Sequence, residues 1–99
     1  MQEIYYQTNP CYLHRKIAGE DILISLGGNV ANFNGYVSLN PTSSFLWDAL
    51  ATPKTLEQLV QALQTEFSVE YSVAKADVQE LLAELLEKGM AREVADDTP

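Results

Sequence analysis

The spacing of apolar residues changes at residue 40, and this change restricts the chain to folds that combine a sheet with helices. Before residue 40, apolar and polar residues tend to alternate, which is the period of a β-strand. After it, apolar residues recur every three or four positions, as on one face of a helix. The pattern predicts an α+β domain with a winged-helix-like arrangement, in which a three- to four-stranded antiparallel sheet is followed by three helices.

Short turn signals divide the first forty residues into strands. Residues 12–17 alternate in polarity, and Gly19 permits a tight reversal into a second strand over residues 21–26. Alternation within this second strand places three aliphatic residues on one face, which we expect to point into the core. These residues are Ile22, Ile24 and Leu26.

Two further turn signals precede the last predicted strand. Gly27-Gly28-Asn29 reverses the chain, and Asn34-Gly35 is typical of a type I′ turn. Residues 36–39 then form the strand that leads into the helices. The sequence leaves open whether Ile4–Tyr6 adds a short strand or stays loose.

Helices are predicted near residues 41–51, 55–67 and 72–88. Asn40 is a good N-cap, and Pro41 suits the first helical position because no backbone donor is needed there. Thr55 and Gln58 have the spacing of a capping box, and Ser72 is expected to cap the third helix. Gly89 would end the third helix in a left-handed conformation. The inward residues of the helices are expected to be Phe45, Leu46, Trp47, Leu50, Leu56, Leu59, Val60, Leu63, Phe67, Val78, Leu81, Leu82 and Leu85.

The chain has 99 residues, a length typical of one domain, with a net charge of 6 − 14 = −8 when His14 is neutral. We divide it into an N-terminal segment (1–11), a folded domain (12–94) and a loose tail (95–99). The negative charge disfavours nucleic acid and anionic membrane surfaces as partners. No apolar run approaches the roughly 20 residues that span a bilayer.

The chain has one cysteine and one histidine, which limits its disulfide and metal chemistry. Cys11 cannot form an internal disulfide, and the start of the chain does not look like a secretion signal, so a cytoplasmic location is expected. Cys11 and His14 alone cannot complete a metal site, and His14 is expected on the solvent side. The sequence therefore predicts no metal and no cofactor.

The sequence also predicts no catalytic site. Ser43 and Ser44 lie in the first turn of a helix, where hydroxyl residues are common for structural reasons. His14 is the one ordinary base available to them. Gly27-Gly28-Asn29 lacks the helix and the further glycine that a phosphate-binding loop requires. We expect a protein that is not an enzyme.

Carboxylates form a stripe on the third predicted helix, at Asp77, Glu80, Glu84 and Glu87. A winged-helix protein that reads DNA presents basic residues from this helix. The main alternative function is a winged-helix interaction or regulatory domain that binds a protein or a nucleic acid. The carboxylate stripe disfavours a nucleic acid as the partner of such a domain. Lys88 follows Glu84 by four residues, so we expect it to be partly engaged there.

Two segments of the chain stand out together by their order and separation. The first is Val37-Ser38-Leu39-Asn40 leading into Pro41-Thr42-Ser43-Ser44-Phe45-Leu46-Trp47. The second runs from Ala76-Asp77-Val78 through spaced leucines to Gly89-Met90. Together they resemble the signatures of the PqqD-like family, also called RiPP recognition elements. The resemblance covers about Leu13 to Arg92.

The resemblance implies a small domain of three strands and three helices that binds the leader of a ribosomally made precursor peptide. It also implies a second partner, a modifying enzyme such as a radical SAM enzyme or another maturase. The extra Asn29–Tyr36 segment departs from the founding member of the quinone pathway. Ala51-Thr52-Pro53 also replaces the acidic-glycine turn of that protein. Both departures favour a relative from another peptide cluster.

An open sheet edge accepts an extended peptide as one more strand, and it also accepts a second copy of the same chain as a homodimer. The resemblance places this edge at the last predicted strand. A neighbouring flank of the third helix would receive guest side chains, although each leucine there is also a good core residue. The predicted peptide-binding residues are Tyr36, Val37, Ser38, Leu39, Asp77, Val78, Leu81, Leu82 and Leu85.

Overall fold

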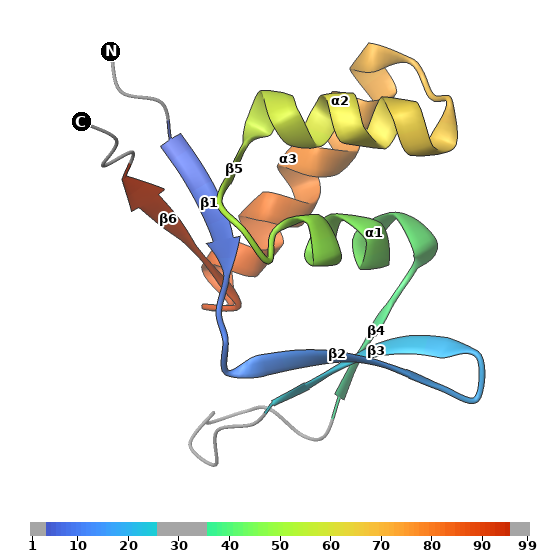
Figure 1. Ribbon diagram of the computed structural model, residues 1–99, viewed down its shortest axis with the longest axis vertical. Helices are drawn as coiled ribbons and strands as arrows, with labels where there is room; N and C mark the ends of the chain where they lie inside the picture. Colours follow the sequence, from blue (N-terminus) through green and yellow to red (C-terminus); the bar gives the residue numbers. More distant parts are fainter. Residues whose placement is uncertain (1–3, 26–35, 96–99) are drawn as a thin grey trace.

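Six strands and three helices make up the described part of the chain, residues 4–25 and 36–95 of a computed structural model (Figure 1). The strands are β1 (Ile4–Thr8), β2 (Tyr12–Ile17), β3 (Glu20–Ser25), β4 (Tyr36–Leu39), β5 (Lys54–Thr55) and β6 (Ala91–Ala95). The helices are α1 (Pro41–Ala49), α2 (Leu56–Phe67) and α3 (Tyr71–Glu87). The predicted α+β class is confirmed.

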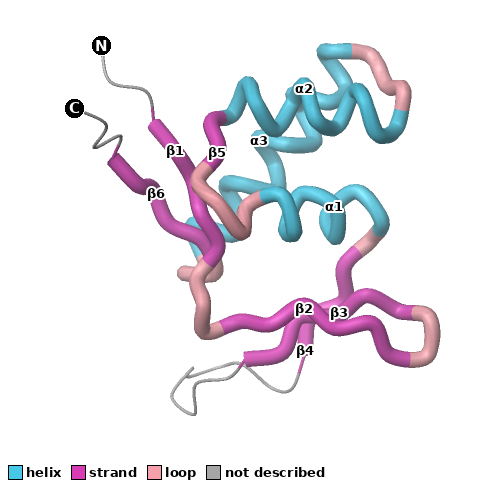
Figure 2. The backbone as a smooth tube through the Cα atoms, in the orientation of Figure 1, coloured by secondary structure: helices cyan, strands magenta, loops and turns pink. Residues whose placement is uncertain are grey.

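The strands form two separate antiparallel sheets. One has the order β2-β3-β4 and the other has the order β5-β1-β6. Figure 2 shows the β2-β3-β4 sheet lying across one side of α1, while β1 and β6 run alongside the helices. The first sheet is therefore connected to the helices through β4, which continues into α1 after Asn40.

The N-terminal segment contributes a strand, which settles the point that the sequence left open. β1 pairs along its whole length with β6, from Ile4 opposite Ala95 to Thr8 opposite Ala91. Neither β6 nor the two-residue strand β5 was predicted. β5 is too short, and β6 with its sequence Ala-Arg-Glu-Val-Ala is too weakly patterned, to be recognised without the partner strand β1.

The predicted inward face of β3 is wrong. Leu23 is fully buried and belongs to the main hydrophobic core, and its cross-strand partner His14 contacts α1. Alternation along the strand places Ile22 on the opposite face, away from the helices. Ile22 is nevertheless only 5% exposed, although it lies outside the main core cluster. The prediction failed because it took the face that carries the aliphatic residue Ile22 as the face that meets the helices.

Several predictions fall outside the described residues. They concern the position of Leu26, the turns at Gly27-Gly28-Asn29 and Asn34-Gly35, and the loose tail from Asp96 to Pro99. The Gly19 reversal lies within the described part and is confirmed. It joins β2 directly to β3.

The predicted starts of the first two helices are confirmed. The Asn40 side chain accepts a hydrogen bond from the Ser43 N–H at 2.7 Å, with Pro41 at the first helical position. Thr55 and Gln58 form the reciprocal capping box, in which each side chain binds the backbone N–H of the other. These contacts fix the residues at which α1 and α2 begin.

The predicted cap of the third helix is wrong. Helix α3 begins at Tyr71, and its N-cap is Glu70, which makes no side-chain capping bond. The connection from α2 is only three residues long, and Ser68 adopts a left-handed conformation with φ 55°. This tight connection brings the chain into helical geometry before Ser72. Gly89, with φ 71°, follows the helix as predicted.

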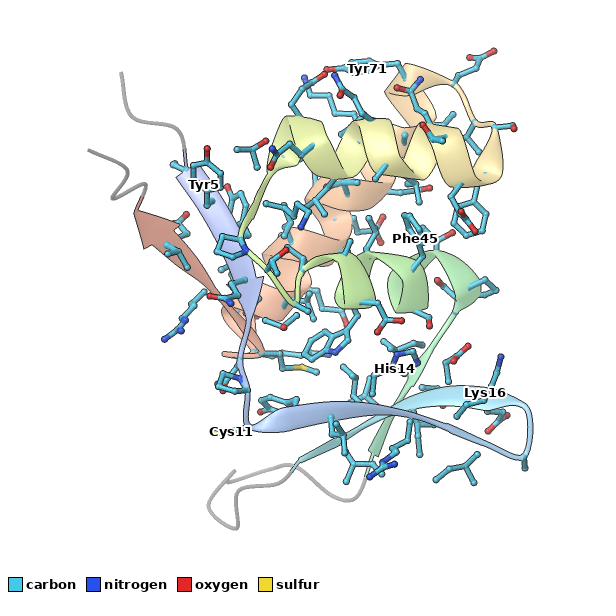
Figure 3. All side chains as sticks on the ribbon, in the orientation of Figure 1. Tyr5, Cys11, His14, Lys16, Phe45 and Tyr71 are labelled. Carbon is cyan, nitrogen blue, oxygen red and sulfur yellow. The ribbon has the colours of Figure 1, made fainter. Side chains whose placement is uncertain are left out.

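The core lies between the three helices and the inner face of the β2-β3-β4 sheet. Trp47 packs edge to face against Tyr12, with ring centroids 6.4 Å apart, and so joins α1 to β2. Phe45 makes a similar contact with Phe67 between α1 and α2 (Figure 3). The buried hydrophobic residues are Tyr12, Ile22, Leu23, Leu46, Trp47, Leu50, Leu59, Val60, Leu63, Ala74, Val78, Leu82, Leu85, Met90 and Ala91.

Candidate functional site

Strand β4 forms an edge of its sheet within the described residues. It pairs with β3 on one side, from Tyr36 opposite Ile24 to Leu39 opposite Asp21, and with no described strand on the other. The side chains of Val37 and Leu39 pack against the core, while Ser38 is exposed. The edge predicted from the sequence is therefore present, with backbone groups available along one side.

The hairpin between β2 and β3 determines which backbone groups point to each neighbour. Its loop has two residues, Ala18 and Gly19, with φ values of 54° and 82°. Two positive φ values identify a type I′ turn, and the flanking residues Ile17 and Glu20 form its hydrogen-bonded pair. The backbone groups of Glu20 therefore point to β2.

Alternation then carries this assignment across the sheet to β4. In an antiparallel ladder, successive residues direct their N–H and C=O groups to opposite sides. Leu23 lies three residues after Glu20, so its backbone groups point to β4, where Val37 is its partner. Ser38 is the next residue, and its N–H and C=O consequently point away from β3. Within the described residues, Ser38 thus offers an added strand a backbone donor and an acceptor, and by the same alternation so does Tyr36 at the start of β4.

A pocket of about 200 Å³ lies close to the end of this edge, between the first turn of α1 and the middle of α3. We refer to it as the α1–α3 pocket. Its α3 wall includes Leu81 and carries three carboxylates, and its α1 wall carries two hydroxyl groups. The residues that line it are Asn40, Thr42, Ser43, Leu46, Asp77, Glu80, Leu81 and Glu84.

The structure divides the predicted α3 residues into two groups. Asp77 and Leu81 line the α1–α3 pocket. Val78, Leu82 and Leu85 are at most 5% exposed and belong to the core, so they support the helix from within. The α1 side of the pocket was missed by sequence reasoning. The available signal was that β4 runs into α1 without a loop, which brings the first turn of α1 next to the edge.

The carboxylates of the pocket are unequally compensated. Lys88 donates to Glu84 at 3.0 Å, as its position four residues later predicts. Asp77 and Glu80 are exposed and have no hydrogen-bond or ion-pair partner among residues 4–25 and 36–95. No lysine or arginine lines the pocket. Its charge is therefore negative and largely unbalanced.

His14 lies in a second polar cluster, at the junction of the β2-β3-β4 sheet with α1 (Figure 3). Its Nδ1 is 2.7 Å from Asp48 of α1, and its Nε2 is 2.9 Å from Asp21 of β3. The side chain is only 17% exposed, so the prediction of a solvent-side imidazole is wrong. Strand alternation puts Leu13 and His14 on opposite faces of β2, but it does not reveal which of the two faces α1 covers.

The two carboxylates set the protonation of the cluster. Burial disfavours the charged imidazole, but hydrogen bonds and charge from Asp48 and Asp21 outweigh it, and the pKa of His14 is raised above its usual 6.5. The hydrogen bond from His14 is the main reason that the pKa of Asp21 is lowered from 3.8. The cluster is therefore a charged clamp between sheet and helix.

Ser44 gives this cluster a superficial likeness to a catalytic triad. Its Oγ is 3.2 Å from His14 Nε2, while Asp48 binds the other ring nitrogen. A general base needs a free lone pair on Nε2, but Asp21 occupies that nitrogen at 2.9 Å. The geometry thus favours a structural ion cluster over an activated nucleophile.

Among the described residues, no group of three His, Cys, Asp or Glu side chains could hold a metal ion. Asp21 and Asp48 bind opposite nitrogens of His14 and so do not converge on one point. Cys11 is exposed at the bend between β1 and β2. In the same part of the chain, no helix has the length and apolar character needed to cross a membrane.

Comparison with known proteins gives a fold relative and a family. A search of curated proteins found no match. A solved structure described as "TbiB1 in Complex with the TbiA(beta) Leader Peptide" superposes with a TM-score of 0.69 and 24% identity, covering 91% of this chain and 99% of that one. The two proteins therefore share a fold. The profile of the family described as coenzyme PQQ synthesis protein D (PqqD) matches residues 20–91, which include β4, α1 and all of α3 with its pocket residues. The chain belongs to the PqqD family.

Proposed function

We propose that this protein is a peptide-binding adaptor without catalysis of its own. It takes the leader of a ribosomally made precursor peptide as an added strand on β4 and presents that peptide to a separate modifying enzyme. The observation that carries the proposal is the free edge of β4, where the Ser38 backbone points outward beside the α1–α3 pocket. Both parts of this site lie within residues 12–94.

The fold relative supports this reading, since TbiB1 is described in complex with a leader peptide. Strand addition also suits the geometry, because backbone pairing provides affinity while neighbouring pockets select side chains. The modifying enzyme would be of the radical SAM class or another maturase. Precursor and maturase would meet the adaptor in the cytoplasm, where the exposed Cys11 thiol needs no disulfide partner.

The test is a titration of the wild type and Ser38 variants with a fluorescently labelled synthetic leader. The peptide is the leader of the precursor encoded beside the gene. Ser38→Pro removes the outward N–H, so it should weaken binding by at least about fivefold, the equivalent of one lost hydrogen bond of about 1 kcal/mol. Ser38→Ala is the matched control, because it keeps the backbone donor and changes only an exposed side chain. Its affinity should equal that of the wild type.

Amide exchange measured by NMR tests the same point without a substitution. The amides of Val37 and Leu39 point to β3 and should be protected in the free protein, whereas the Ser38 amide should become protected only when the leader binds. A leader that binds without protecting Ser38 would place the site elsewhere. The winged-helix alternative predicts a gel shift with DNA or RNA at low salt, which the acidic face of α3 disfavours.

A further inference from the structure

The α1–α3 pocket has a composition that limits what can enter it. Leu81 is half-buried and supplies a small apolar surface, whereas Leu46 is only 1% exposed. Asp77 and Glu80 stand at the α3 wall without partners among the described residues. Residues at i and i+3 of a helix lie on the same side, so these two carboxylates face one region of space. The pocket is therefore mainly polar and acidic, with one small apolar surface at Leu81.

The α1 wall of the pocket does not favour an anionic group either. The first turn of a helix usually offers free N–H groups to an anion. In α1, Pro41 has no N–H, and the amides of Ser43 and Ser44 are already bound to the side chain and carbonyl of Asn40. Little donor capacity is left for an acidic guest.

A lysine or arginine side chain matches both properties. Its aliphatic stem can lie along apolar surface while its charged head reaches carboxylates. We propose that the α1–α3 pocket binds a basic side chain of the leader, with its stem against Leu81 and its head between Asp77 and Glu80. This inference rests on the proposed function and names the chemistry that the site selects.

The pocket also indicates where this basic residue lies in the leader. Asn40 lines the pocket and directly follows Leu39, the last residue of β4. A guest strand paired along β4 therefore reaches the pocket only after it passes Leu39. The basic residue should flank the segment that pairs with β4 and lie outside it.

The experiment compares two double variants that change the net charge equally. Asp77→Asn with Glu80→Gln neutralises the pocket and keeps the shapes of both side chains. Glu66→Gln with Glu87→Gln neutralises two exposed carboxylates that do not line the pocket. Titration with the labelled synthetic leader at low salt should show that the pocket variant binds about fivefold or more weakly and that the control binds as the wild type does. The difference should shrink in high salt.

A charge exchange identifies the peptide residue. Each Lys or Arg of the leader is replaced by Glu in turn, and each peptide is titrated against the wild type and Glu80→Lys. One replacement, outside the β4-paired segment, should bind poorly to the wild type and recover affinity with the variant. If the leader binds the wild type but the two double variants behave alike, the pocket inference is wrong and the adaptor function stands. If the leader does not bind the wild type at all, the proposed function itself fails.

Discussion

At the scale of single residues, the side chain of His14 connects the β2-β3-β4 sheet to α1. It binds Asp21 on β3 and Asp48 on α1 through its two ring nitrogens. The clamp therefore holds the β2-β3-β4 sheet against the helix that follows β4. It is the single histidine of the chain, so imidazole titration reports on this junction alone.

The clamp predicts a pH-dependent stability. Because folding raises the pKa of His14, its contribution is complete below the unfolded value near 6.5 and is lost as pH rises through the folded value. The lowered pKa of Asp21 acts in another window: its contribution is present above 3.8 and is lost as pH falls through the folded value. His14→Gln should therefore cost more free energy of unfolding at about pH 5.5 than at about pH 8.

Guanidinium denaturation of both proteins at the two pH values measures this difference. Ser72→Ala provides the control, because Ser72 is exposed and carries no titrating group in this range. A cost of His14→Gln that is the same at both pH values would show that the imidazole is not preferentially charged in the folded state.

Leu81 and Leu82 are adjacent in α3 but differ in location, since Leu81 lines the α1–α3 pocket and Leu82 lies in the core. Leu82 is buried, so Leu82→Ala should lower the free energy of unfolding by about 2–5 kcal/mol through loss of packing and the resulting cavity. Leu81 is half-buried on the pocket wall, so Leu81→Ala should cost less stability and should weaken binding of the leader. Thermal unfolding and leader titration of the two variants separate these effects. Equal losses of stability with no loss of affinity in Leu81→Ala would remove Leu81 from the site.

At the scale of helices and strands, capping differs sharply between α2 and α3. Thr55 binds the backbone of Gln58 in a complete capping box, whereas α3 has no side-chain cap. Thr55→Ala should lower the free energy of unfolding by about 1 kcal/mol. Ser72→Ala should change it by less than about 0.5 kcal/mol, because Ser72 lies inside the helix and is exposed. Urea denaturation of both variants checks this, and a larger loss for Ser72→Ala would contradict the observed start of α3.

Local signals in the sequence were sufficient for the helices and the first sheet. Asn40, the Thr55 capping box and the Gly19 reversal each act through neighbouring residues, and the structure has all three. Features that depend on distant partners were not predictable in this way. Strand β6 exists because β1 pairs with it from the other end of the chain. The inward face of β3 is likewise set by the position of α1, which the aliphatic pattern of the strand does not encode.

The candidate site shows the same division. The strand β4 follows from its position between a turn signal and a helix, but its place at the edge of the sheet was implied only by the family resemblance. The pocket requires α1 and α3 to lie close together, and residues such as Thr42 and Glu84 are 42 positions apart in the sequence. Burial then separates Leu81 from the core leucines of the same helix. That distinction depends on helix packing, which spacing alone leaves undetermined.

At the scale of the whole molecule, the β4 edge predicts competition between two guests. An unpaired edge in a small domain can pair with the same edge of a second copy. We expect the average mass measured by light scattering to rise with protein concentration and to fall when saturating leader is added. Ser38→Pro should reduce the association, and Ser38→Ala should not. A mass that stays monomeric at every concentration would show that the edge is protected.

The pairing of β1 with β6 has a consequence for how this domain can be carried by larger proteins. Ile4 lies directly opposite Ala95, so the chain enters and leaves the described domain about one strand spacing apart, roughly 5 Å. A domain of this kind can be inserted into a surface loop of a host protein with little distortion of either. Circular permutation with a short linker between the ends should also preserve the fold. The β4 edge belongs to the other sheet, so either rearrangement leaves this edge unobstructed by the junction.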